Sequence, residues 1–227
     1  MMGADATVKS FATYEPWVAR TVGETGKYIN GLAFKPTDWG DDGMPIIRIQ
    51  NLTNPTKPLN RTTRVVDPIY VVNPGDILVS WSATLDVFIW DRVPSLLNQH
   101  IFKVVPDTTV VTKKFLFYAL KKAIAEMIKS EHLHGSTMKH INRGPFLAHK
   151  IEVPTLAQQD EIVDELEKQF SRLDEAVANL QRAKANLKRY CSGQVISDSS
   201  IDFLDVDSRS KALGDMLPSF ECSLMLL

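Results

Sequence analysis

Cysteine is scarce in this sequence, which has two among its 227 residues, Cys191 and Cys222. Two widely separated cysteines do not form the disulfide framework of small secreted domains. Long apolar runs are missing as well, since no stretch approaches the ~18 residues that a membrane-spanning helix requires. Residues 1–10 contain no apolar core typical of a signal peptide. These absences predict a cytoplasmic protein without a membrane partner.

The sequence also lacks the short motifs of several enzyme classes. It contains neither the Gly-x-x-x-x-Gly-Lys-Ser/Thr loop of ATPases nor a Gly-x-Gly-x-x-Gly dinucleotide motif. The Asn/Asp-Pro-Pro-aromatic segment with which amino-methyltransferases hold a target base is absent, as is the Asp/Glu-x-Lys of common metal-dependent nucleases. We therefore assign no catalytic residue and expect a protein that is not itself an enzyme.

Metal-binding chemistry is equally sparse. His132 and His134 are spaced to share one face of a strand, but neither a nearby cysteine nor a His-Glu-x-x-His helix accompanies them. We expect no metal site and interpret the histidines as satisfied or exposed side chains. For His140, contact with phosphate is an alternative, because Lys139 and Arg143 are close to it in the sequence.

Charge is distributed unevenly along the chain, although the formal net charge is only -1. Residues 1–155 hold 18 Lys/Arg against 14 Asp/Glu, residues 156–191 hold 6 against 7, and residues 192–227 hold 2 against 6. A mildly basic first section permits a polyanion as partner but does not require one.

Up to about Pro154 the sequence predicts a domain of mixed α and β structure. Short stretches rich in β-branched residues are bounded by turn-forming residues, which is the pattern of strands. In the turn at residues 73–76, Pro74 presets one backbone angle and Gly75 tolerates the next. The predicted strands are residues 45–50, 69–72, 76–80 and 99–105.

One helix is predicted inside this domain, from about residue 112 to residue 130. Its apolar residues fall on one face at steps of three and four. Its lysines, at positions 113, 114, 121, 122 and 129, lie mostly elsewhere. They form either a solvated face or a set of contacts to a phosphate backbone.

A different pattern begins after Pro154. Residues 156–190 contain neither proline nor glycine, and apolar positions recur at alternating steps of three and four, a heptad pattern. At ~1.5 Å per residue the predicted helix is ~50 Å long. Its apolar stripe requires a partner helix, so we expect coiled-coil dimerisation. The stripe consists of Val163, Leu166, Phe170, Leu173, Val177, Leu180 and Leu187, with Lys184 in phase.

We expect this helix to end near Gly193, since glycine is a common helix terminator. Residues 192–227 are acidic and continue no periodic pattern, so they form a tail to which we assign no role. The predicted organisation is a recognition domain over residues 1–155, a helix over 156–191 and a tail over 192–227.

Several motifs occur in a specific order. The first stretch runs from Tyr28-Ile-Asn-Gly-Leu-Ala-Phe-Lys-Pro-Thr-Asp-Trp39 to Ile46-Ile-Arg-Ile-Gln-Asn-Leu52. Pro74-Gly-Asp-Ile-Leu78 and Leu97-Asn-Gln-His-Ile-Phe102 follow. The last stretch comprises Gly135-Ser-Thr-Met-Lys-His-Ile141 and Ile151-Glu-Val-Pro-Thr-Leu-Ala-Gln-Gln-Asp-Glu-Ile-Val163. Together, over about residues 15–191, they resemble the DNA-specificity (S) subunit of type I restriction–modification enzymes.

The resemblance implies an α+β target-recognition domain that leads into a long, coiled-coil-forming spacer helix. It implies a non-catalytic subunit that binds double-stranded DNA and docks modification (methyltransferase) subunits, which methylate adenine. A restriction subunit adds DNA cleavage to the complex. S-adenosylmethionine, ATP and Mg are then expected on the partner subunits, with no cofactor on this chain. A usual S subunit has two recognition domains and two spacers, whereas this sequence has one of each, a half-length form.

Candidate DNA-binding residues lie in polar loops, because base edges and phosphates are read by hydrogen-bonding side chains. Trp81 is as readily interpreted as a packing aromatic. The segment 135–140 recurs in family members with different targets, so it is expected to position DNA or support the fold. The candidates are Lys35, Arg48, Gln50, Asn51, Ser80, Trp81, Ser82, Ser136, Thr137, Lys139 and His140.

Two functions from different classes remain open at this point. The first is a DNA-reading specificity subunit that acts as a homodimer. The second is a coiled-coil assembly scaffold, or a decayed gene fragment, that no longer reads DNA. A stand-alone enzyme is disfavoured by the missing motifs.

Overall fold

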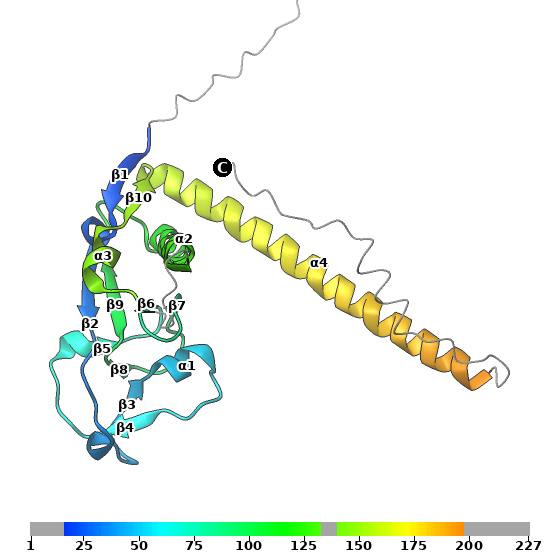
Figure 1. Ribbon diagram of the computed structural model, residues 1–227, viewed down its shortest axis with the longest axis horizontal. Helices are drawn as coiled ribbons and strands as arrows, with labels where there is room; N and C mark the ends of the chain where they lie inside the picture. The colour runs from blue at the N-terminus through cyan, green and yellow to red at the C-terminus, as the bar shows by residue number, and fades with distance from the viewer. Residues whose placement is uncertain (1–15, 133–139, 198–227) are drawn as a thin grey trace, which may run out of the picture. The chain divides into compact units, whose positions relative to one another are not determined.

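The computed structural model describes residues 16–132 and 140–197 (Figure 1). The chain divides into two compact units, and the border between them lies between Gln169 and Phe170, inside the last helix. Among the described residues, the first unit contains ten strands and three α-helices, and the last helix begins in it. This organisation is the α+β domain with a long C-terminal helix that the sequence predicts.

Three small sheets make up the β structure of the first unit. The first has the order β2-β9-β6-β7 and is antiparallel throughout. The second has the order β4-β3-β8-β5, with a parallel pairing between β3 and β8. The third pairs β1 (Val18–Thr21) with β10 (Lys150–Val153), and so joins the two ends of the domain.

The remaining strands are short, as expected for a domain with frequent turns. Those of the first sheet are β2 (Gly26–Asn30), β9 (Ile101–Pro106), β6 (Ile77–Ser80) and β7 (Asp86–Ile89). Those of the second sheet are β4 (Asn60–Thr62), β3 (Met44–Ile47), β8 (Ser95–Leu97) and β5 (Val71–Val72). The four strands predicted from β-branched residues correspond to β3, β5, β6 and β9, each within a few positions.

Helix α2 (Lys113–His132) covers the main core and confirms the helix predicted over residues 112–130. Phe115, Leu116, Leu120 and Ile124 are buried on its inner face together with β-strand residues such as Val79. This face follows from the three- and four-residue spacing of apolar side chains, which places them on one side of the helix.

Short helices form the connections. They are the 3-10 turns η1 (Val22–Thr25), η2 (Pro36–Asp38) and η3 (Pro68–Tyr70), and the α-helices α1 (Ile49–Thr53) and α3 (Arg143–Ala148). In η1, the Glu24 carboxylate accepts hydrogen bonds from the Thr21 amide and hydroxyl. These bonds lower the pKa of Glu24.

The predicted turn at residues 73–76 is confirmed. The Asp76 amide donates to the Asn73 carbonyl at 3.0 Å, and Gly75 has a φ of 92°, which favours glycine. The Asp76 carboxylate accepts from the Asn73 amide at 2.9 Å and pairs with Lys103 of β9 at 3.3 Å. The turn is thereby tied to the first sheet.

Helix α4 (Leu156–Ser197) is the long helix that the heptad pattern predicts, and it is 42 residues long. It continues past Gly193, so the expectation that this glycine ends the helix is wrong. A single glycine costs a helix only about 1 kcal/mol, which the rest of a long helix offsets. Of the predicted tail, residues 198–227 lie outside the described residues. No helix of the described part is both long and apolar enough to span a membrane.

Candidate nucleic-acid interface

One polar cluster forms around the indole ring of Trp81, just after strand β6. We define the Trp81 cluster as Asn30, Trp81, His100 and His140. The ring meets the imidazoles of His100 and His140 edge-on, with centroids 4.8 Å and 4.9 Å away. The indole N–H donates a hydrogen bond to Asn30 Oδ1 at 3.2 Å. Four segments that are distant in the sequence therefore meet at one aromatic side chain.

Backbone contacts fix the same cluster. The Trp81 amide donates to the His100 carbonyl at 3.2 Å, and the Trp81 carbonyl accepts from the Ile141 amide at 3.0 Å. Ser82 forms an isolated antiparallel bridge with His140. His100 and Ala83 have φ values of 71° and 61°, a region that costs non-glycine residues roughly 1–2 kcal/mol. Such conformations persist only where the surrounding structure imposes them, which indicates a tightly specified surface.

The chemistry of this cluster suits a polar ligand. Trp81 is half-buried and His140 is exposed. Within the described residues, the buried atoms His100 Nδ1 and Asn98 Oδ1 have no hydrogen-bond partner. A buried polar atom left unpaired costs about 1–3 kcal/mol, so each of them favours an additional partner. Indole and imidazole rings that present both apolar faces and N–H groups can contact sugar and phosphate.

The two serines beside Trp81 differ in accessibility. Ser80 is fully buried, and its hydroxyl donates to the Ser82 carbonyl at 3.3 Å. It therefore holds the turn after β6 and does not face a ligand, a correction to its place among the candidate DNA contacts. Ser82 is half-buried next to His140 and stays a candidate.

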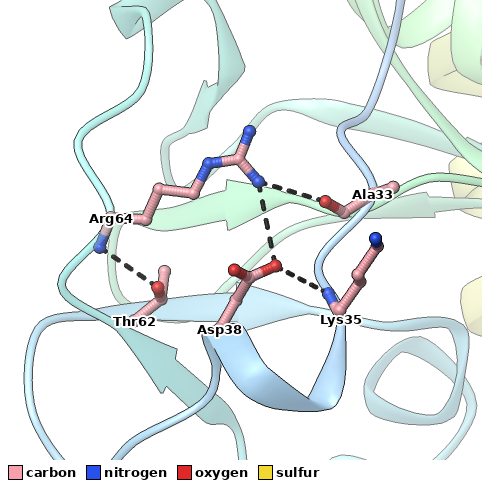
Figure 2. A network of polar contacts seen from close by, with 5 residues as sticks. All are labelled: Ala33, Lys35, Asp38, Thr62 and Arg64. Carbon is pink, nitrogen blue, oxygen red and sulfur yellow. Dashed lines mark hydrogen bonds and ion pairs between the residues drawn. The ribbon is translucent and has the colours of Figure 1, made fainter.

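A second polar region lies on the sheet that contains β3 and β4. We define the arginine group as Arg48, Arg61 and Arg64. The Arg64 guanidinium donates to the Ala33 carbonyl at 3.2 Å and pairs with the Asp38 carboxylate at 3.8 Å (Figure 2). The same carboxylate accepts from the Lys35 amide at 2.7 Å, so η2 and the segment after β4 are joined at Asp38.

Arg48 is positioned by an aromatic ring. Its Cζ atom lies 4.8 Å from the centroid of Trp39, and its Nη1 donates to Asn60 Oδ1 at 3.4 Å. Arg61 donates to the Gly43 carbonyl at 2.8 Å. A guanidinium has five N–H donors in a planar fork that fits phosphate or guanine. The contacts named here use only part of that capacity, so these arginines are held in place with donors remaining.

Asn51 has a structural role, in contrast to the prediction that it contacts DNA. Its side chain is 2% exposed. Its Oδ1 accepts from the Arg48 amide at 3.0 Å, and its Nδ2 donates to the carbonyls of Lys57 and Pro58 at 3.2 Å and 3.0 Å. Because both amide donors and the oxygen are used inside the chain, Asn51 closes the loop that follows α1 and presents Arg48.

The other predicted DNA contacts separate into two places. Lys35 and Gln50 are exposed near the arginine group, and Ser82 and His140 are at the Trp81 cluster. The sequence motifs around Trp81 and His140 are thus brought together by the fold. Ser136, Thr137 and Lys139 lie outside the described residues.

The lysines of α2 are mostly engaged within the chain. Lys114 pairs with Glu167 of α4 at 2.9 Å, Lys121 with Asp86 of β7 at 2.9 Å, and Lys122 with Glu126 at 3.9 Å. The hydrogen bond that Lys114 donates to the Glu167 carboxylate raises the pKa of Lys114. These pairs favour the solvated-face interpretation of this lysine set over phosphate contact.

The apolar stripe of α4 has two different environments. Val163 is 2% exposed and packs in the main core of the first unit, so it is not available to a partner helix. This corrects its place in the predicted dimerisation seam. Leu166 is partly buried. Farther along, Phe170, Leu173, Val177, Leu180 and Leu187 are 44–69% exposed, which is unusual for large apolar side chains at regular spacing.

Metal chemistry has no obvious location in the described part of the chain. No group of three or more His, Cys, Asp or Glu side chains lies close enough there to hold an ion. The candidate sites therefore consist of hydrogen-bond donors, aromatic rings and an exposed helix face.

Comparison with known protein families shows to which family this chain belongs. The family described as the type I restriction modification DNA specificity domain matches residues 14–188. This chain belongs to the type I DNA specificity family. The match spans both the recognition unit and most of α4, so it covers the Trp81 cluster, the arginine group and the exposed stripe.

Individual relatives of this specificity domain support the same family. The chain is 25% identical over 179 residues to the EcoBI specificity subunit of Escherichia coli, covering 78% of this chain and 37% of that subunit. It is 21% identical over 182 residues to the MjaVIII specificity subunit of Methanocaldococcus jannaschii, covering 77% and 41% respectively. The chain thus spans about two fifths of the length of these relatives.

The fold of the specificity domain also occurs in solved structures. The HsdS subunit of Thermoanaerobacter tengcongensis aligns with a TM-score of 0.57 at 21% identity, over 77% of this chain and 42% of that one. A type I S subunit from M. genitalium aligns with a TM-score of 0.52 at 17% identity, over 85% and 49%. At these identities the likeness concerns the fold.

Sequence reasoning about the specificity domain missed several residues that build its surface. Asn30, Trp39, His100 and Arg64 contribute through contacts between distant segments, which no local spacing indicates. Gln159, which is 0% exposed, was also missed as an interior polar residue, although a glutamine on the inward face of a helix start is a recognisable signal.

Proposed function

We propose that this chain is the DNA-reading specificity subunit of a type I restriction–modification complex and acts as a homodimeric half-subunit. It directs adenine methylation and DNA cleavage that partner subunits carry out. The observation that carries the proposal is the exposed heptad stripe of α4 beside one recognition unit, in a chain that spans about two fifths of the length of the relatives named above. Two copies would restore the two units of a full-length subunit.

DNA reading is assigned to the Trp81 cluster and the arginine group. Arg48, Arg61 and Arg64 supply guanidinium forks, and Lys35 and Gln50 lie nearby with exposed polar ends. Trp81 supplies an aromatic ring and His140 an exposed imidazole. These are the donor types that proteins use on phosphates and on guanine and adenine edges. The proposal gives this chain no chemical step, and the cofactors of methylation and cleavage belong to the partner subunits.

The helix suggests a specific dimer register. In an antiparallel coiled coil, a positions of one helix pack with d positions of the other. Placing Phe170 against Leu187 of a second copy also places Val177 against Leu180 and Leu173 against Lys184. This register buries most of the exposed stripe in a single symmetric seam, with one lysine whose ammonium can reach solvent at the edge.

Cysteine cross-linking tests that register. In a background with Cys191 and Cys222 replaced by Ser, the pair Val177→Cys with Leu180→Cys is expected to form an intermolecular disulfide. The single Leu173→Cys variant is the control, because its copies lie ~16 Å apart in this register but face each other in a parallel dimer. Cross-linking of the Leu173→Cys control would indicate a parallel arrangement instead, in which the variant with both cysteines also cross-links.

Binding to DNA separates the proposal from a scaffold that no longer reads DNA. The protein, with and without a modification subunit, is titrated with random-sequence DNA at several salt concentrations. Phosphate contacts give a logarithmic affinity that falls by ~0.9 per contact for each logarithmic unit of salt. Bound sequences selected from a random library then reveal the half-site. A weak affinity that does not change with salt would support the scaffold.

A further inference from the structure

The side chain of Gln159, in the first turn of α4, is 0% exposed and fully occupied by backbone contacts. Its Oε1 accepts a hydrogen bond from the Thr112 amide at 2.7 Å. Its Nε2 donates to the carbonyls of Val110 and Pro154, at 3.0 Å and 2.9 Å. One amide therefore joins the start of α4, the end of the β10 segment and the loop that leads into α2.

An interior glutamine needs a reason, because burial of an amide is favourable only when its hydrogen bonds are made. An apolar side chain would fill the same space with fewer constraints. Hydrogen bonds to three backbone groups are directional, so they specify both the rotation of α4 about its axis and its position along that axis. Apolar packing alone allows sliding and tilting at much lower cost.

Two further contacts follow at one-turn intervals on the same side of α4. Val163, four residues after Gln159, is buried in the main core. Glu167, four residues later again, pairs with Lys114 of α2 at 2.9 Å. The polar clamp at Gln159 is the first of three attachments along this face. All three lie before Phe170, where the exposed stripe begins.

We infer that Gln159 is a positioning residue that sets the direction in which the spacer helix leaves the recognition unit, and thereby the distance between the two DNA half-sites. This inference rests on the proposed function. From Gln159 to Leu187 the helix runs ~42 Å at 1.5 Å per residue. A tilt of about 10° at the clamp would displace the far end by ~7 Å, roughly two base-pair steps of ~3.4 Å. A small change at one buried amide is thus amplified by the helix.

The test compares Gln159→Met with Gln158→Leu. Methionine matches glutamine in length and lacks branching, so it fills the site while removing all three hydrogen bonds. Gln158 is the neighbouring glutamine, whose Oε1 accepts from the Thr155 amide at 3.1 Å at the part-buried helix start. Each variant is expressed with the modification subunit in cells, and the methylated sites are sequenced.

The Gln158→Leu variant and the unchanged protein are expected to methylate their half-sites at one gap length. Gln159→Met is expected to methylate the same half-sites at several gap lengths, with at least a tenfold rise in the share of sites that have an altered gap. A merely structural role would lower methylation at all sites without altering the gap. Gln159→Leu, which also fills the site with an apolar side chain and removes the same three hydrogen bonds, should broaden the distribution in the same way.

The outcomes remain distinguishable. A single unchanged gap in a folded and active Gln159→Met variant would overturn the inference and leave the proposed function intact. No methylation at interrupted sites by the unchanged protein would overturn the proposed function itself. If Gln159→Met does not fold, the gap distribution of Gln159→Leu decides, and a single unchanged gap there likewise overturns the inference.

Discussion

At the scale of single residues, Trp81 carries more contacts between distant segments than any local pattern around it suggests. Replacing it by alanine removes the ring that orients His100, His140 and Asn30. We expect Trp81→Ala to weaken DNA binding at least tenfold, measured by fluorescence anisotropy with the selected half-site. Trp81→Phe, which keeps a ring but not the indole N–H, should bind DNA with an affinity between those of Trp81→Ala and the unchanged protein. Equal affinity for all three proteins would remove Trp81 from the interface.

Arg48 offers a sharper test of phosphate contact. Each phosphate contact adds ~0.9 to the slope of logarithmic affinity against logarithmic salt concentration. Arg48→Ala is therefore expected to lower affinity and to reduce that slope by about one. Lys122→Ala is the control, because Lys122 is exposed and pairs within α2 with Glu126. A slope that Arg48→Ala leaves unchanged would point to base contact or to packing on Trp39.

The candidate site was only partly predictable at this scale. Loop composition drew attention to Arg48, Trp81 and His140, which the fold places in the arginine group and the Trp81 cluster, because polar loops carry recognition in most folds. It could not separate Arg48 from Asn51, since burial depends on how the loop after α1 closes. Asn51 and Ser80 look like surface polar residues in the sequence, yet their hydrogen-bonding atoms serve the backbone.

At the scale of elements, α4 combines a tertiary contact with an exposed face along one periodic stripe. A matched pair of substitutions tests the buried part and the exposed part of this stripe separately. Val163→Lys places a charge in the core of the recognition unit, which costs on the order of 3–5 kcal/mol for an unpaired buried charge. It is expected to lower the thermal unfolding midpoint by ten degrees or more, given a few degrees per kcal/mol.

Leu173→Lys makes the same chemical change ten positions later on an exposed face. It is expected to leave the unfolding midpoint of the recognition unit nearly unchanged and to abolish self-association in sedimentation experiments. A dimer that survives Leu173→Lys would show that self-association, if present, uses another surface.

The helices and several strands were predictable because their signals are local. The three- and four-residue spacing indicates α2 and α4 directly, and the Asn73 to Asp76 turn follows from proline and glycine chemistry. Strands such as β1 and β4 carry no comparable local signal. They form because distant segments pair, as Val18 does with Val153. The heptad pattern predicted a single partner helix for the whole apolar stripe. The spacing of apolar residues is the same whether a helix packs on its own domain or on another chain, so it could not separate the two.

At the scale of the whole molecule, twofold symmetry is the main consequence of the proposed homodimer. Two identical recognition units related by a twofold axis must read two identical half-sites in inverted orientation. We expect the methylated sites in cells that express this protein and its modification subunit to be interrupted palindromes. Asymmetric half-sites would indicate pairing with a different S fragment.

The length of the spacer sets the gap in that palindrome. Duplicating the heptad of residues 177–183 keeps the stripe in phase and adds apolar positions to the seam, so the dimer should persist. The added seven residues move the recognition units ~10 Å farther apart at 1.5 Å per residue. That distance corresponds to about three base-pair steps. A longer gap also rotates one half-site relative to the other, because DNA makes one turn per ~10.5 base pairs, and this rotation opposes the largest shift. We therefore expect the gap to lengthen by about one to three base pairs with the half-site sequence unchanged. Duplicating two residues, 182–183, is the control, because at ~100° per residue it turns the following stripe to the opposite side of the helix and should abolish dimerisation and methylation together. An unchanged gap after the heptad duplication would mean that the spacing of the half-sites is set outside α4.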